Sequence, residues 1–280
     1  MWDLRQQVLR GTTDCLSLPQ TIILVVVGFL AGGFGAIAGV GGGIIITPVL
    51  VLFFHVPLPN AVAASLTAVI ATSTAASSVH VERHVTDVRL AMTLELTTTL
   101  GAAVAAIVSA HINHRVIAVI FICFLLYSAS SMLKKELNSR KHVHQESWEI
   151  GQAYSVRNYP AGLGMALIAG SVSGLLGIGG GPIKVPAMYL IMGVPLRVAT
   201  ATSNFMIGVT AATSALVYYG RGDLRMGIAG PLVVGVFSGS LIGARLAPRM
   251  KTRAIAYLLI TLMVYLSGQM AYKIATGSFQ

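Results

Sequence analysis

The chain has 280 residues, of which 55% are hydrophobic and only 10% are charged, and its formal net charge is +10. Because a soluble domain carries about 25% charged residues, this composition excludes a soluble globular protein and predicts an integral membrane protein. The excess of basic residues does not indicate nucleic-acid binding, since these residues lie in short loops between apolar segments, where they set the orientation in the lipid bilayer.

Ten apolar segments follow one another along the chain, and a polar stretch divides them into two groups of five. A polar lead-in covers residues 1–20. The first membrane repeat, residues 21–133, is expected to hold segments 21–38, 44–56, 60–79, 90–110 and 116–133. A basic cytoplasmic linker covers residues 134–159. The second repeat, residues 160–275, is expected to hold segments 160–176, 182–192, 197–219, 226–246 and 254–274. The sequence therefore predicts an all-α membrane fold, in which segments 44–56 and 182–192 are short of the roughly 20 residues that a span needs.

The second group of segments repeats the first at a constant spacing. Gly39 recurs as Gly177 and Ser65 as Ser203, each 138 positions later (177 − 39 = 138 and 203 − 65 = 138), which indicates an internal duplication. Basic loops stay in the cytoplasm, so the linker and the loop around residues 245–253 are both expected inside. Five passes per half meet this condition and place the halves in inverted orientation, with both termini outside. Four passes per half, which would make the halves parallel, are the alternative.

Two runs of three glycines interrupt the apolar sequence at corresponding positions of the two halves. They are Gly41, Gly42 and Gly43, and Gly179, Gly180 and Gly181. Glycine runs unwind helices, and paired interruptions in the two halves of a secondary transporter indicate a substrate site near the membrane midplane. The helix that begins after each break points its free N–H groups and positive dipole end into the break, which suits an anion. A purely structural role as close-packing sites is the alternative.

Polar side chains near the breaks are the other candidates for substrate binding. Lys184 lies three residues after the second triplet, and a lysine deep in a membrane is functional by default, although it could instead extend to the interface. Hydroxyl and amide groups that could hydrogen-bond an oxyanion are carried by Ser65, Thr202, Ser203 and Asn204. The alternative for these four is that they bond neighbouring helices or their own backbone.

Glu95 is the one carboxylate well inside an apolar segment, so it is the candidate for carrying a coupled proton. The alternative is an interfacial position, with Arg89 as its partner. His80 and His84 share a helix face but do not form the His-Glu-x-x-His zinc motif, so no metal site is predicted. The sequence contains no nucleotide-binding motif either, so no cofactor is expected and any transport would be driven by gradients.

The second half carries GIGGGPIKVP at residues 177–186 and ATATSN at residues 199–204. In duplicated membrane halves, this pattern resembles the sulfite exporter TauE/SafE family, also called the toluene sulfonate uptake permease family. The resemblance covers about residues 20–275. It implies the transport of sulfite, thiosulfate, sulfonates or sulfur-containing organic acids. The first half departs from the pattern at Ile44 and Leu66, where the second half has Pro182 and Asn204. Any pseudosymmetric site is therefore expected to be asymmetric in its side chains.

The residues and the resemblance together predict a multi-pass secondary transporter of the cell (inner or plasma) membrane. Its expected activity is export of a small sulfur-containing oxyanion such as sulfite, thiosulfate or an organosulfonate, with proton coupling as an option. A passive anion channel and a transporter of a non-sulfur organic anion are the alternatives. A membrane-embedded enzyme would need a nucleophile–base pair or paired carboxylates at depth, which the sequence does not show, so no enzymatic activity is expected. The expected partners are the small anion and the lipid bilayer, and the oligomeric state stays open.

Overall fold

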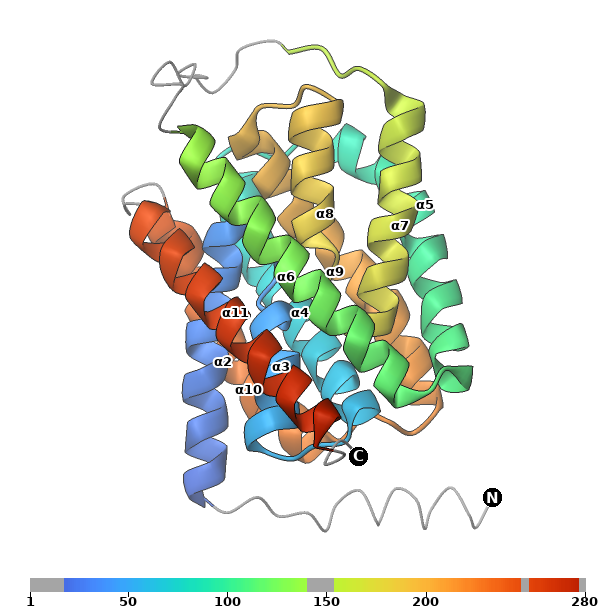
Figure 1. The fold of residues 1–280 in the computed structure, drawn as a ribbon. Coiled ribbons are helices and arrows are strands. Elements are labelled where there is room, and N and C mark those ends of the chain that lie inside the picture. Colours follow the sequence, from blue (N-terminus) through green and yellow to red (C-terminus); the bar gives the residue numbers. More distant parts are fainter. Residues whose placement is uncertain (1–17, 140–153, 248–251, 277–280) are drawn as a thin grey trace.

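A computed structural model describes residues 18–139, 154–247 and 252–276, and within these ranges the chain is helical, without strands (Figure 1). The first group of helices is α2 (Leu18–Ala38), α3 (Gly43–Phe53), α4 (Leu58–Glu82), α5 (Val88–Val108), the 3₁₀ turn η1 (Ser109–His111) and α6 (His114–Ser139). The second group is α7 (Tyr159–Leu176), α8 (Gly181–Pro186), the π-helical turn η2 (Ala187–Ile191), α9 (Leu196–Gly220), α10 (Met226–Leu246) and α11 (Thr252–Ala275).

Six of the described helices are long and apolar enough to cross a membrane: α2, α4, α5, α6, α7 and α10. The outer helices present apolar side chains to the surroundings. On α5, for example, Met92, Leu96, Leu100 and Val104 are exposed at four-residue spacing, which forms one apolar face. In a membrane this face is covered by lipid. The predicted all-α membrane fold is therefore confirmed.

The helix boundaries recur along the chain at the spacing that the sequence predicts. Helix α9 begins 138 residues after α4 (196 − 58 = 138), and α10 begins 138 residues after α5 (226 − 88 = 138). The short helix α3 corresponds in the same way to α8 together with η2. Figure 1 shows that α6 (green) and α11 (red) lie side by side and run in opposite directions across one face.

The two groups of helices interlock. The most extensive packing is between α2 and α10 and between α5 and α7, while α4 packs on α9 in the centre. Glycines allow the backbones to approach closely in both interlocking pairs. A Cβ atom on Gly32 of α2 would lie 2.4 Å from the carbonyl oxygen of Val236 in α10, and one on Gly170 of α7 would lie 2.0 Å from that of Thr98 in α5. Small residues are what membrane helices use to pack at such distances.

The short α8–η2 segment returns to the end of the bundle at which α7 starts. The backbone N–H of Arg157, just before α7, donates to the carbonyl oxygen of Met192 at 3.0 Å. The side-chain amide of Asn158 donates to the carbonyl oxygen of Ile191 at 3.2 Å. Helix α7 and the α8–η2 segment therefore form a hairpin whose bend is the second glycine run.

Parts of the predicted lead-in and linker lie outside the described residues. Residues 1–17 belong to the lead-in, and α2 begins within it, at Leu18 rather than at residue 21. Residues 140–153 belong to the predicted linker 134–159. Its first six residues are helical, because α6 continues to Ser139. The predicted segment 44–56 ends earlier than expected, at Phe53.

Asp87 connects the start of α5 to two other parts of the chain. Its carboxylate accepts a hydrogen bond from the backbone N–H of Leu90 at 2.9 Å, which caps the helix, and another from the hydroxyl of Tyr154 at 2.5 Å. Its backbone N–H donates to the hydroxyl of Thr202, near the start of α9, at 3.0 Å. Burial raises the pKa of the Tyr154 hydroxyl and the hydrogen bond to Asp87 raises it further, so this phenol stays a neutral donor.

Replacing Asp87 by alanine is expected to lower the free energy of unfolding by about 1–2 kcal/mol, because an N-cap is lost and the Tyr154 hydroxyl loses its acceptor. Thermal unfolding of the purified protein in detergent measures this change. The control is Glu82→Ala, at the exposed last residue of α4, which should leave the melting temperature unchanged. Equal melting temperatures for the two variants would contradict the prediction.

Candidate functional site

The two glycine runs break the helical hairpins by adopting backbone angles that other residues rarely adopt. In the first break, Gly39, Gly41 and Gly42 have φ values of 74°, 81° and 72°. In the second, residues 177, 179 and 180, also glycines, have φ values of 72°, 79° and 73°. Such left-handed angles cost little only for glycine. The chain resumes helical geometry at Gly43 and at Gly181, the first residues of α3 and α8.

The two breaks meet each other inside the bundle. A Cβ atom on Gly43 would lie 2.5 Å from the carbonyl oxygen of Gly177, and one on Gly181 would lie 2.4 Å from that of Gly39. The side chains of Val69 and Ile207, at the middle of α4 and α9, are the nearest atoms to both Gly41 and Gly179. The crossing of the breaks is therefore a close contact of backbone against backbone and methyl groups.

The serines that were candidate ligands hydrogen-bond the carbonyl groups that the breaks release. The Ser65 hydroxyl lies 2.8 Å from the carbonyl oxygen of Gly177, and the Ser203 hydroxyl lies 3.3 Å from that of Gly39. Freed backbone carbonyl groups in a membrane need such donors. In this structure both hydroxyls therefore serve the backbone, which is the alternative that the sequence left open.

The other two candidates on α9 lie toward the end where α9 begins. Thr202 accepts the hydrogen bond from the backbone N–H of Asp87 described above. The side-chain nitrogen of Asn204 lies 3.1 Å from the carbonyl oxygen of Ala36 and 3.3 Å from Nε2 of His80, while its buried side-chain oxygen has no hydrogen-bond partner in the described chain. Among the hydrogen bonds of the described residues, neither Thr202 nor Asn204 therefore contacts Lys184.

Lys184 is the centre of the one buried ion pair in the described residues, and we call this group the Lys184 site: Lys184, Glu95 and Thr210. The ammonium Nζ atom lies 3.6 Å from Oε2 of Glu95 and 2.7 Å from the hydroxyl of Thr210. That hydroxyl in turn lies 2.6 Å from Oε1 of Glu95. Lys184 is only 2% exposed and Glu95 only 7%. Lys184 therefore does not extend to the interface, and the partner of Glu95 is Lys184 rather than Arg89.

Three elements from both halves of the chain bring the Lys184 site together. Glu95 lies seven residues after the start of α5, about 10 Å along the helix at 1.5 Å per residue. Lys184 lies in the first turn of α8, directly after the second break, and Thr210 lies near the middle of α9. The positions that correspond to them at the 138-residue spacing hold Val233, Ile46 and Thr72. The charged site is therefore present once and not twice, so the two groups of helices differ at this point.

A small cavity of about 10 Å³ lies against Lys184. Its lining is otherwise apolar and rich in methionine; the other lining residues are Leu94, Gly162, Ala166, Ala187, Met188, Met192 and Met206. About one water molecule fits such a space. Methionine side chains are flexible and adapt their shape, so the wall of this cavity can yield to a somewhat larger guest.

Arg221 forms a second charged cluster, at the far end of α9. One of its guanidinium nitrogens lies 2.9 Å from the carbonyl oxygen of Ala106 and 2.9 Å from the hydroxyl of Ser109, and another lies 2.9 Å from the carboxylate of Asp223. The guanidinium also stacks 4.6 Å from the centre of the Tyr218 ring. These contacts tie the end of α9 to the end of α5.

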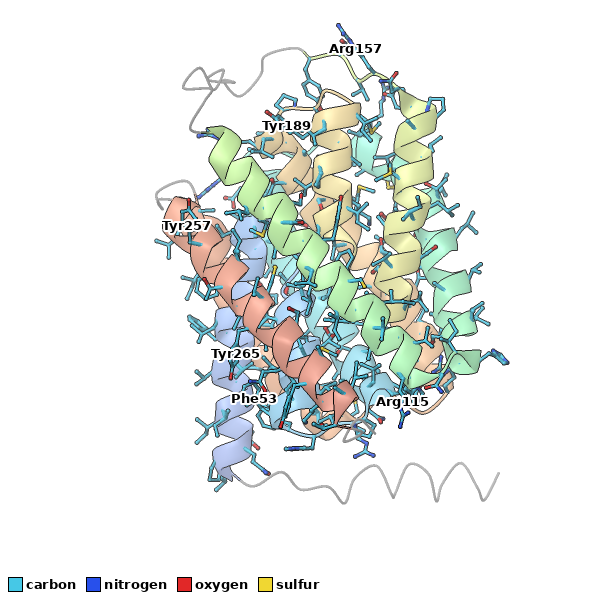
Figure 2. The ribbon with its side chains drawn as sticks, in the orientation of Figure 1. Phe53, Arg115, Arg157, Tyr189, Tyr257 and Tyr265 are labelled. Carbon is cyan, nitrogen blue, oxygen red and sulfur yellow. The ribbon has the colours of Figure 1, made fainter. Side chains whose placement is uncertain are left out.

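No group of three or more histidine, cysteine, aspartate or glutamate side chains gathers into a metal site within residues 18–139, 154–247 and 252–276. Figure 2 shows Arg157 and Arg115 at opposite ends of the bundle, with the apolar helices between them.

Comparison with known proteins adds the following findings. A family model described as "Sulfite exporter TauE/SafE" matches residues 24–270. A Bacillus subtilis (strain 168) protein described as "Probable membrane transporter protein YunE" is 30% identical, over 90% of this chain and 97% of that protein. A "Probable membrane transporter protein" of Xylella fastidiosa (strain Temecula1) is 24% identical, over 89% of this chain and 96% of that protein. "Sulfite exporter TauE/SafE family protein 6" of Arabidopsis thaliana is 26% identical, over 54% of this chain and 34% of that protein. No solved structure matches the chain.

Proposed function

Because the chain belongs to the sulfite exporter TauE/SafE family of membrane transporters, we propose that it is a secondary transporter that exports a small sulfur-containing oxyanion, such as sulfite, thiosulfate or an organosulfonate. The Lys184 site is where we place substrate binding. Glycines 41–43 and 179–181 shape the hairpins beside it. Ser65, Thr202, Ser203 and Asn204 then support the breaks and the start of α9 rather than contacting the anion in this conformation.

The buried ammonium group of Lys184 is the observation that carries this proposal. Lys184 is 2% exposed, it lies directly after a helix break, and it lines a small, otherwise apolar cavity. An ammonium group offers three hydrogen-bond donors and a full positive charge, which attracts an anion strongly where water is excluded.

The proposal includes an inverted arrangement of the two halves, residues 21–133 and 160–275. Its support is that α6 and α11 run in opposite directions and that the helix boundaries recur at 138 residues. The two most basic stretches, residues 134–158 and 245–253, include the ends of α6 and α10. The positive-inside rule would place these stretches in the cytoplasm and the start of α2 and the end of α11 outside.

Uptake into liposomes tests the substrate class. The purified protein is reconstituted, and uptake of sulfite, thiosulfate, sulfoacetate, an aryl sulfonate, sulfate and acetate is measured with and without a pH gradient. We expect saturable uptake of at least one of the sulfur compounds other than sulfate, with counterflow, because a carrier exchanges bound substrate across the membrane. Acetate uptake alone would favour a non-sulfur organic anion, and non-saturable flux would favour a channel. Absence of uptake for every sulfur oxyanion, with a well-folded protein, would overturn the proposed substrate class.

A further inference from the structure

We propose that the carboxylate of Glu95 is the resident anion of the Lys184 site and is displaced by the substrate, with Glu95 taking up one proton as it loses the lysine. The inference rests on the proposed function and deepens it, because it states how export of the anion is coupled to a proton. Each transported anion would then carry one proton with it.

The geometry of the ion pair leaves room for an exchange of partners. The ammonium Nζ atom and Oε2 of Glu95 are 3.6 Å apart, which is longer than a hydrogen bond, and Oε2 has no hydrogen-bond partner in the described chain. The other carboxylate oxygen is held separately, by the hydroxyl groups of Thr210 at 2.6 Å and Thr99 at 3.3 Å. Thr210 therefore keeps Glu95 in place when Lys184 turns to another anion.

Thr210 also allows the lysine to change partners without losing all its hydrogen bonds. Its hydroxyl lies 2.7 Å from Nζ and accepts from the ammonium group, while its own proton points to the carboxylate of Glu95. An oxyanion that enters the cavity beside Lys184 would meet the remaining donors of the ammonium group. Thr210 thus keeps its hydrogen bonds to both side chains, and the incoming anion competes only with Glu95 for the ammonium group of Lys184.

For a monovalent anion, charge balance requires the proton, and the second charge of a dianion such as thiosulfate makes a neutral Glu95 still more favourable. In the empty site, one ammonium group and one carboxylate compensate each other. When an anion pairs with Lys184, a carboxylate that is 7% exposed is left without its partner, and an unpaired charge at this depth is costly. Binding one proton converts the carboxylate to a neutral carboxylic acid and breaks no covalent bond. Loss of the anion on the other side of the membrane reverses both steps.

Glu95 is the titratable group that this exchange affects. The elements packed against α5 are α7, α9 and η1, and α8 reaches it through Lys184. Apart from Lys184, the titratable or charged groups on these elements and on α5 lie near helix ends, and none has a contact with Glu95 among those described. They are Arg89, His111, Tyr159, Arg197, Tyr218 and Tyr219.

Calorimetric titration with thiosulfate and sulfite tests the exchange. Thiosulfate is the preferred probe, because it does not itself take up protons near neutral pH. Binding to the purified protein is measured from pH 6 to pH 8, in buffers with different ionisation enthalpies, which yields the protons taken up per anion. For the wild type we expect one proton per thiosulfate and a Kd that rises about tenfold per pH unit where the exchange operates.

Three variants separate the coupling role from a structural one. Glu95→Gln should bind thiosulfate with no proton uptake and with a Kd that does not depend on pH. Glu95→Asp, which keeps the carboxyl group, should restore uptake of one proton. Asp223→Asn removes a carboxylate that lies just after the last residue of α9 and pairs with Arg221, and it should keep the wild-type stoichiometry.

The outcomes distinguish the two proposals. Thiosulfate or sulfite binding by the wild type without proton uptake, or continued one-proton uptake by Glu95→Gln, would overturn the exchange and leave the proposed function standing. Absence of both binding and transport of these anions and of the sulfonates by the folded wild type would overturn the proposed function and the exchange with it.

Discussion

Replacing Lys184 by glutamine is expected to reduce uptake of the transported anion at least 100-fold. The substitution removes the positive charge that faces the cavity, and it leaves the Glu95 carboxylate buried and unpaired, so that an entering anion would meet a negative charge. Uptake into liposomes at equal protein content measures the loss. Because removal of one partner of a buried ion pair costs about 3–5 kcal/mol of stability, the thermal unfolding of the variant must be measured in parallel.

Two further variants show whether the loss comes from the site or from misfolding. Lys184→Gln combined with Glu95→Gln leaves no unpaired charge, so it should recover most of the lost stability while transport remains absent. Lys273→Gln is the control, because Lys273 is a partly buried lysine that donates instead to the carbonyl oxygens of Val51 and Leu52, at the end of α3. It should keep transport. Normal transport by Lys184→Gln would remove this lysine from the site.

Replacing Gly181 by alanine is expected to prevent a folded, active transporter from forming. The new Cβ atom would lie 2.4 Å from the carbonyl oxygen of Gly39 and 2.8 Å from Cα of Val40, and both are backbone atoms that cannot turn aside. The backbone of residue 181 is helical, so the strain comes from the close approach and not from its φ angle. Overpacking costs about 1–3 kcal/mol and occasionally more, and we expect a loss of at least about 3 kcal/mol here.

A matched glycine on α7 provides the control for this substitution. Gly164 is exposed within the helix, and a Cβ atom there would meet nothing within 4 Å. Gly164→Ala should therefore stabilise the protein by about 0.5–1 kcal/mol, since alanine favours the helix over glycine. The yield of monodisperse protein and its melting temperature compare the two variants. A Gly181→Ala protein that melts at or above the wild-type temperature would contradict the contact between the breaks.

The hydropathy of the sequence was enough to predict where most helices lie. Segment 226–246 coincides with α10, and segment 197–219 differs from α9 by one residue at each end. The prediction was wrong where a helix leaves the apolar region. Helix α6 continues through Lys134 and Lys135 to Ser139, because a helix can extend beyond the hydrocarbon layer into water, where hydropathy no longer marks it.

The sequence identified two of the three residues of the Lys184 site, but not their pairing. Lys184 and Glu95 stood out singly, because charged residues are rare inside apolar segments. Their pairing could not be predicted, since they lie on different halves of the chain and no local spacing connects them. Thr210 gave no signal at all. Its neighbour Thr213 donates to the carbonyl oxygen of Val209, four residues earlier, which is the usual role of threonine in a membrane helix. The sequence does not distinguish Thr210 from Thr213.

The interlocking of the two halves has a consequence for how the protein is made. The main packing partner of α2 is α10 and that of α5 is α7. The glycine-containing surfaces of α2 and α5 are therefore covered only when the second half is present. During translation the first half enters the membrane earlier and has only lipid for a neighbour on those surfaces. Stability is therefore acquired late in biogenesis, after α10 has been inserted. An ancestor consisting of one half alone could have built the same core only with a second copy of itself.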